Sequence, residues 1–234
     1  MNLEALRQEI RKLGSPERAN QSLRFFRTGP GEYGEGDKFF GLTVPEMRAI
    51  AKQYRDLDHH EALELLQSEW HEDRLVALLL LLDGYKRGDD SRRRRIHRAY
   101  LANTHRINNW DLVDMSAGSI VGAHLDAAEI SLLLKLARSK ELWERRIAIV
   151  ATFHFIKRGE LTPTLRISEM LLGDRHDLIH KAVGWMLREV GKKDRKVLDS
   201  FLAKHYREMP RTMLRYAIER HPEPIRKRYL AGTI

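Results

Sequence analysis

The two residues best placed to do chemistry in this sequence are a tryptophan and an aspartate four positions apart, Trp110 and Asp114. On a helix that spacing puts both side chains on one face, one turn apart. Either Trp110 lies at the edge of the core while Asp114 ties a neighbouring helix, or the pair forms a stacking surface beside a fixed negative charge. An indole face and a carboxylate both favour positive charge, so the second arrangement would stabilise a cation.

Composition limits what else the chain can be. Its 234 residues are 32% charged and 42% hydrophobic, which is typical of a globular protein rather than a disordered one. Lys and Arg exceed Asp and Glu by 42 to 33, a net charge of +9 that favours an anionic partner, nucleic acid first. The absence of cysteine excludes disulfides and thiolate metal sites.

Membrane insertion and metal chemistry find no support in the sequence. The first residues are amphipathic without an apolar signal core, and the longest apolar run, Leu75–Leu82, is far shorter than the ~20 residues of a membrane span. We therefore expect a cytoplasmic protein without a membrane partner. No HExxH or Ser-His-Asp motif occurs, and His59-His60 is expected to be a surface pair, so we expect no metal and no cofactor.

Helical periodicity covers nearly the whole chain, and no stretch shows sustained strand alternation. Ser15-Pro16 and the Thr43/Glu46 capping box mark helix starts, whereas the glycine-rich stretch from Thr28 to Gly41 must be a loop. The sequence predicts an all-α protein with helices at about 3–13, 16–27, from 43, 58–68, 71–87, 91–101, 108–121, 125–138, 141–158, 161–172, 176–191, 194–204, 210–219 and 222–230.

A repeat of about 36 residues organises these helices. The segments Arg74–Gly88 and Arg146–Gly159 both begin with Arg, run apolar for three turns and end in Lys-Arg-Gly; their starts lie 72 residues apart. Trp110 falls midway between the two starts. A helix-pair repeat of this length is typical of a HEAT-like α-solenoid, an ARM/HEAT superhelix with one helix of each pair on its concave side. We expect a single such domain over residues 1–234, with a basic cleft.

The repeat register predicts which residues share the concave face. Successive repeats place there first Arg74, Trp110, Arg146, Lys181 and Tyr216, and one turn later Leu78, Asp114, Val150, Trp185 and Arg220. Two tryptophans, one carboxylate and several cations would thus converge. Such a lining suits a curved, charged polymer such as DNA.

Three segments in this order and spacing resemble the DNA alkylation repair (AlkD-like) glycosylase family, which is built of HEAT-like repeats. They are Trp110–Asp114, Leu142–Ile149 and Lys181–Glu189, and the resemblance extends over about residues 3–220. It implies that Trp110, Asp114 and Trp185 lie in the catalytic cleft and that Arg146 contacts the DNA backbone. Together with the register, the candidate DNA contacts are Arg146, Lys181, Arg188, Arg74 and Arg220.

The resemblance implies that the partner is duplex DNA containing alkylated purines, and we expect the protein to be a monomer. An N3- or N7-alkylated purine is already cationic, so its glycosidic bond is weak and no strong general acid is needed. Charge then develops on the sugar as an oxocarbenium ion, which a carboxylate such as Asp114 stabilises between two indole faces. The resemblance adds that the damaged base need not be flipped into a tight pocket.

Some features leave alternatives open. His154 stands where we expect a lysine, and the loop Gly29–Gly41, with Tyr33, Asp37 and Lys38, could reach DNA or only bridge two helices. The run Arg92–Arg95 surrounds a helical turn, so a solvated outer helix competes with a nucleic-acid contact. Trp70 and Trp143 are interpreted as packing residues. The functional alternative is a non-catalytic helical-repeat protein that binds nucleic acid or a protein partner.

Overall fold

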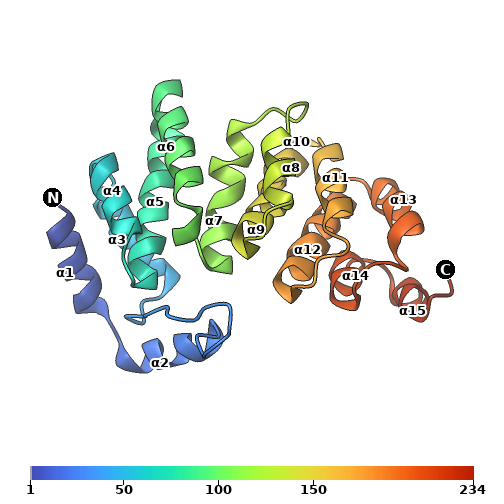
Figure 1. The fold of residues 1–234 in the computed structure, drawn as a ribbon, viewed down its shortest axis with the longest axis horizontal. Coiled ribbons are helices and arrows are strands. Elements are labelled where there is room, and N and C mark those ends of the chain that lie inside the picture. Colours follow the sequence, from blue (N-terminus) through green and yellow to red (C-terminus); the bar gives the residue numbers. More distant parts are fainter. Residues whose placement is uncertain (1) are drawn as a thin grey trace. The chain divides into compact units, whose positions relative to one another are not determined.

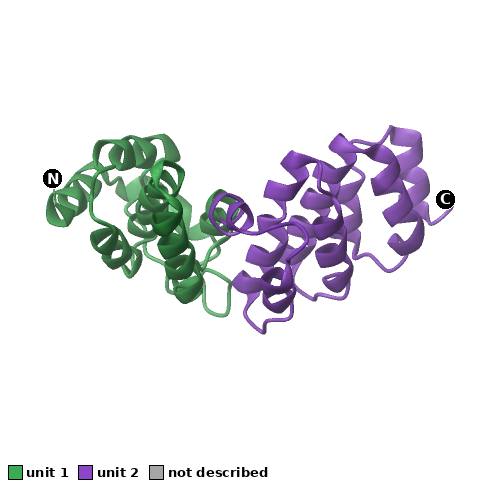
Figure 2. Ribbon diagram, turned by 90° about the horizontal axis from the view of Figure 1, so that it is seen from above, with its two compact units in different colours: residues 1–116 green, residues 117–234 purple. Residues whose placement is uncertain are grey.

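The computed structural model describes residues 2–234, and every regular element in this range is a helix (Figure 1). Outside the helices, an isolated bridge pairs the backbones of Lys38 and Trp70. The chain forms two compact units, residues 1–116 and 117–234 (Figure 2). Of the helices described, none is both long and apolar enough to cross a membrane. The all-α prediction is confirmed, while a single domain over 1–234 stays a prediction.

Local signals explain where the first helices of unit 1 begin. Asn2 caps α1 by accepting from the backbone N–H of Ala5, and Ser15 caps α2 directly before Pro16. Helix α3 begins with a capping box in which Glu46 accepts from the backbone N–H and the hydroxyl of Thr43. The elements of this unit are α1 (Leu3–Leu13), α2 (Pro16–Phe25), α3 (Val44–Gln53), α4 (His59–Leu66), α5 (His71–Arg87), α6 (Asp90–Ala102), η1 (Thr104–Arg106) and the first part of α7 (Trp110–Ile120).

Helix α5 is the centre of unit 1. It packs against α3, α4 and α6, and its apolar run Leu75–Leu82 is buried on almost every side. A helix that is apolar all round must lie in a core. Unusually, the four residues that open α5 are charged or titratable and also buried: His71, Glu72, Asp73 and Arg74. Burial of such groups requires ion pairs or hydrogen bonds, so the start of α5 is a place where polar partners must be found.

Unit 2 is likewise built of packed helices. Helix α12 packs against α9 on one side and α14 on the other, while α8 and α13 pack against α9 and α12 respectively. The elements are the end of α7, η2 (Gly122–His124), α8 (Ser131–Ala137), α9 (Leu142–Ala151), α10 (Phe153–Arg158), α11 (Thr162–Met170), α12 (Asp177–Lys193), α13 (Arg195–His205), α14 (Arg211–Ala217) and α15 (Glu223–Ala231).

The repeat positions fall where the sequence places them. Each lies in the later helix of a consecutive pair: Arg74 in α5, Trp110 in α7, Arg146 in α9, Lys181 in α12 and Tyr216 in α14. The helical-repeat class is confirmed by this order.

Two predicted helices differ from the structure. The one expected at 125–138 begins only at Ser131, because Asp126 instead accepts the N–H groups of Ala128 and Glu129 in a turn. The one expected at 141–158 is interrupted at Thr152, whose hydroxyl donates to the carbonyl of Ile149 at 2.6 Å. A threonine hydroxyl that bonds back to the preceding turn competes with the helical ladder and bends it.

Candidate functional site

Helix α7 begins at Trp110 because Asn109 caps it. The Asn109 side chain is fully buried, and its Oδ1 accepts from the backbone N–H of Trp110 at 2.8 Å. Its backbone carbonyl accepts from Val113 at 3.1 Å. Trp110 and Asp114 therefore lie one turn apart on a capped helix, and both are half-buried. They are held by the fold yet retain surface toward solvent.

An aromatic wall, which we define as Phe25, Phe26, Phe39 and Trp110, runs from the end of α2 to the start of α7. The Phe26 ring stacks on Trp110 at 5.4 Å and on Phe39 at 5.1 Å. Phe25 meets Trp110 edge-on at 5.7 Å and is 64% exposed. An exposed phenylalanine beside a half-buried tryptophan offers a surface on which a flat or apolar ligand group could stack.

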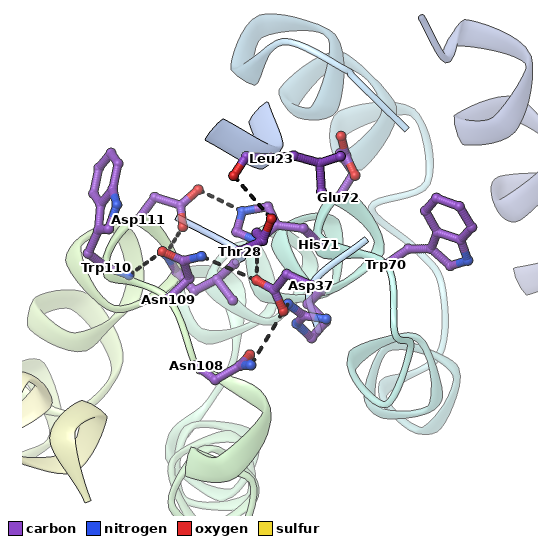
Figure 3. Close-up of polar contacts among 12 residues, drawn as sticks. Leu23, Thr28, Asp37, Trp70, His71, Glu72, Asn108, Asn109, Trp110 and Asp111 are labelled. Carbon is purple, nitrogen blue, oxygen red and sulfur yellow. Dashed lines mark hydrogen bonds and ion pairs between the residues drawn. The ribbon is translucent and has the colours of Figure 1, made fainter. Parts of the chain in front are cut away.

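Against the wall lies a polar cluster, which we define as Asp37, His71, Arg74, Asn109 and Asp111; the first four are buried and Asp111 is partly buried. Figure 3 shows Asp37, His71, Asn109 and Asp111. The cluster joins the loop before α3 to the starts of α5 and α7. Asp37 accepts from Arg74 at 2.6 Å, from Asn109 at 3.2 Å and from His71 Nδ1 at 3.4 Å. On its other side the His71 ring places Nε2 2.8 Å from Asp111. The imidazole therefore bridges two carboxylates.

Electrostatics favour the charged form of this imidazole. Burial alone would lower the pKa of His71, but Asp111 and Asp37 outweigh it and raise that pKa to about 9. Burial likewise would raise the pKa of Asp37, yet the hydrogen bond from His71 and the charge of Arg74 hold it below its usual value. With His71 protonated, the cluster contains two cations and two anions. Equal numbers of positive and negative charges offset the cost of removing these groups from water.

The loop that carries Asp37 is tied down along its length. The buried carboxylate of Glu72 accepts backbone N–H groups from Phe40 at 3.0 Å, Gly41 at 2.7 Å and Leu42 at 3.2 Å. Trp70 lies beside it and stacks on Phe40 at 3.9 Å, which agrees with its interpretation as a packing residue. The glycine-rich loop is thus anchored to the start of α5.

Arg74 does not fit the expectation that it faces DNA. It is 2% exposed, and its guanidinium donates to Asp37 and, at 3.1 Å, to the carbonyl of Ser68. The repeat register assigns Arg74 to the same helix face as Trp110. In the structure, its ion pair with the Asp37 carboxylate places the guanidinium inside the polar cluster. Its role in the structure is an internal ion pair.

In unit 2, the candidate tryptophan is accessible and the candidate arginine is not. Trp185 is half-buried on α12, with its ring 5.8 Å from that of Phe153. Arg146 is 4% exposed and donates to the carbonyl of Leu178 at 2.5 Å. The contact between Arg146 and DNA stays a prediction. In the structure, the buried Arg146 side chain joins α9 to α12 through its bond to Leu178.

The other candidate DNA contacts of unit 2, Lys181, Arg188 and Arg220, lie nearer the surface than Arg146 does. Lys181 forms an ion pair with Asp177 at 2.7 Å, Arg188 pairs with Glu219, and Arg220 is exposed. His154 is half-buried, and burial followed by the charge of Arg158 lowers its pKa. It is therefore largely neutral at pH 7 and is not equivalent to the lysine expected there.

The candidate site residues fall in both units. Trp110 and Asp114 belong to residues 1–116, whereas Trp185, Arg146, Lys181, Arg188 and Arg220 belong to residues 117–234. Their meeting in one cleft stays a prediction. Across residues 2–234, no group of three or more His, Asp and Glu side chains is arranged to hold a metal ion.

Sequence reasoning missed several residues that surround Trp110. Phe25 and Phe26 appear in the sequence only as the end of an amphipathic helix, and His71 and Asp111 only as helix-start residues. The one available signal is the group of titratable residues, His71 to Arg74, directly before an apolar run. Because that run is buried on almost every side, the turn that precedes it lies in the core as well.

Comparison with known proteins concerns the family and the fold of the chain. A sequence model described as DNA alkylation repair enzyme matches residues 6–221. A solved structure described as "Predicted DNA alkylation repair enzyme from Enterococcus faecalis" is similar over 90% of this chain and 97% of its own, with a TM-score of 0.69 and 17% identity. At that identity the likeness concerns the fold. No curated protein matches the chain.

Proposed function

The chain belongs to the DNA alkylation repair enzyme family, and from that premise we propose that it is a DNA glycosylase releasing N3- and N7-alkylated purines from duplex DNA. The observation that carries the proposal is the pair Trp110 and Asp114, both half-buried and one turn apart on a capped helix. An indole face beside a carboxylate suits a cationic sugar. Stabilisation of that sugar by these two side chains does not depend on a metal or a redox cofactor.

The proposed reaction breaks the bond between C1′ of the deoxyribose and the purine nitrogen. The bonding electron pair leaves with the alkylated base, which departs neutral because it was cationic. The sugar becomes an oxocarbenium ion, and water then attacks C1′ and loses a proton. Asp114 stabilises the developing charge and orients the attacking water, and it is the group we propose as the catalytic carboxylate.

The aromatic wall supplies the surface on which the lesion lies. The Trp110 face and the exposed Phe25 ring together offer stacking to a flat cation, with each contact contributing about 0.5–2 kcal/mol. We propose Trp185 as the second indole against the sugar. Phe25 is an addition to the residues that the sequence suggested.

Surface cations would hold the DNA backbone without reading its sequence. Lys181, Arg188 and Arg220 are the proposed phosphate contacts, since each lies at or near the surface. Arg146 and Arg74 are buried, and we propose that they support the site by fixing the helices around them.

The experiment that tests the proposal measures release of free 7-methylguanine from an alkylated duplex by the purified protein. Asp114→Asn keeps the shape of the side chain but removes its charge, and should slow single-turnover release by about 10²–10³-fold. Asp126→Asn is the matched control, because this exposed carboxylate accepts the N–H of Ala128 and an amide oxygen can replace it. It should release base at the wild-type rate.

Two outcomes would contradict the proposal in different ways. If Asp114→Asn releases base as fast as the wild type, the reaction uses another carboxylate. If the wild type releases no base and Asp114→Asn unfolds, Asp114 is a structural residue and the chain is a non-catalytic binding protein.

A further inference from the structure

The Trp110 ring packs against residues outside its own helix. The cap on α7 fixes the backbone of Trp110, but a half-buried indole still has more than one rotamer available to it. The ring packs against Phe26, and Phe26 in turn packs against the imidazole of His71 at 4.9 Å. The orientation of the indole therefore depends on what holds Phe26 and His71.

We propose that His71, Asp37 and Asp111 act as a positioning triad for Trp110, with the His71 ring held between the two carboxylates and in contact with the aromatic wall. The inference rests on the proposed function, since it assigns a role in base excision to residues that do not touch the DNA. The proposal also assigns a structural role to the glycine-rich loop, because Asp37 is the loop residue that belongs to the triad.

One route from the triad to Trp110 runs through the backbone of α7. His71 Nε2 donates to Oδ2 of Asp111, while Oδ1 of Asp111 accepts the N–H of Leu112 at 2.8 Å. Asn109, the residue on the other side of Trp110, donates to Asp37 at 3.2 Å. Both neighbours of Trp110 are thus tied to the same imidazole or to its partner carboxylate, and the first turn of α7 cannot shift without breaking these bonds.

The second route runs through ring contacts. Phe26 lies between the His71 imidazole and the Trp110 indole, tilted by 35° to the first and by 28° to the second. Phe39 stacks on His71 from another direction at 4.8 Å. Aromatic contact to a protonated imidazole adds cation–π attraction to apolar packing, so the imidazole fixes Phe26 and Phe26 fixes the indole.

The arrangement requires charge as well as shape. Asp37 and His71 are almost fully buried, the Asp111 side chain is 17% exposed, and Arg74 is the other charged partner of Asp37. An amide at position 111 could still contact Nε2, but the protonated ring would lose half of its counter-charge in a poorly solvated site. Truncating one partner of a buried ion pair costs far more than truncating an exposed one. Asp111→Asn should therefore loosen the ring without removing a side chain from the core.

Fluorine NMR of the full-length protein labelled with 5-fluorotryptophan tests the proposal directly. The chain has four tryptophans, so four resonances are expected, and Trp110→Phe assigns the relevant one. In Asp111→Asn and His71→Gln the Trp110 resonance should shift or broaden, while those of Trp143 and Trp185 stay in place. Asp90→Asn is the matched control, because its carboxylate pairs with Arg93 on the surface. It should leave all four resonances unchanged.

Kinetics then separate positioning from general stability. Below the melting temperature of each variant, single-turnover release of 7-methylguanine by Asp111→Asn should fall by about 10- to 100-fold, as expected for a misplaced group in an active site. The Kd for undamaged duplex should stay within about twofold of the wild type, because none of the three triad residues is among the proposed phosphate contacts.

The possible results separate the positioning triad from the proposed glycosylase function. If the Trp110 resonance is unchanged in folded Asp111→Asn, the positioning triad is wrong, whatever the protein does to DNA. If the resonance moves but the wild type releases no base, the triad positions Trp110 and it is the proposed glycosylase function that fails. Should His71→Gln not fold, Phe26→Leu replaces it, since leucine keeps the apolar contact but removes the ring; an unmoved Trp110 resonance in that variant overturns the second route.

Discussion

The imidazole Nε2 of His71 lies 2.8 Å from Oδ2 of Asp111, the residue that directly follows Trp110. A histidine from the start of α5 is thereby joined to the helix that carries the proposed catalytic pair. With the pKa of His71 raised to about 9, the bond is an ion pair at neutral pH. Buried ion pairs are expensive to desolvate and are weak evidence of stability, so their best-attested use is to specify one arrangement of neighbouring elements.

The first prediction concerns pH. Because the pKa of His71 is higher in the folded chain than the 6.5 of a free imidazole, its contribution to stability is complete below pH 6.5 and is lost as pH rises through about 9. The free energy of unfolding should fall by up to about 3 kcal/mol between these limits. Urea denaturation at pH 7, 8 and 9 measures the slope.

His71→Gln is the comparison for that slope. The histidines whose pKa burial lowers, namely His59, His154 and His176, titrate below this window, and the tyrosines with raised pKa titrate above it. The variant should therefore be less stable at pH 7 and nearly flat from pH 7 to 9. An equal slope in both proteins would mean that His71 does not carry the extra proton.

The second prediction concerns the tight turn that leads the loop into α3. Gly41 has φ of 85°, and an added Cβ would overlap the backbone of Ser15 and Ala19. Gly41→Ala should destabilise the chain by about 2–4 kcal/mol, as measured by urea denaturation. Gly36→Ala is the matched control, because Gly36 has nearly the same φ, 84°, but open space around it. Equal losses in the two variants would show that the close approach to α2 is unimportant.

The third prediction concerns salt. Each phosphate contact contributes about −0.9 to the slope of log K against log salt concentration for duplex DNA. Lys181→Gln and Arg220→Gln should each make the slope shallower by about that amount, for damaged and undamaged duplex alike. Lys86→Gln removes the same charge from an exposed position at the end of α5, outside the predicted DNA face, and should leave the slope unchanged. A uniform change in all three would indicate an effect of net charge alone.

Much of the fold was predictable because its signals are local. The Thr43/Glu46 box and the Ser15 cap lie at the starts of the helices that they specify, and one period of the 36-residue repeat covers a single pair of consecutive helices. Trp110 and Asp114 could be placed on one helix face for the same reason: four positions on a helix is a fixed geometry.

The surroundings of Trp110 were not predictable, because they depend on contacts between distant segments. Phe26 and Trp110 are 84 positions apart, and Asp37 and His71 are 34 apart, yet both pairs are in contact. The position of Arg74 in the repeat predicts that it shares a helix face with Trp110. That position carries no information about the buried carboxylate of Asp37, which lies in a loop. That carboxylate is the reason why Arg74 is internal.

The last prediction is that the charge of the leaving base decides which lesions are released. In the proposed reaction Asp114 stabilises the sugar cation, and no residue is assigned to protonate the departing base. Cationic 7-methylguanine and 3-methyladenine should therefore be released from an otherwise identical duplex, whereas neutral uracil should remain at the uncatalysed background. Single-turnover assays of the three duplexes, with Asp114→Asn beside the wild type, provide the comparison. Release of uracil at a rate close to that of 7-methylguanine would require a general acid in the site, and the proposed mechanism, in which Asp114 stabilises the sugar cation without such an acid, would then be wrong.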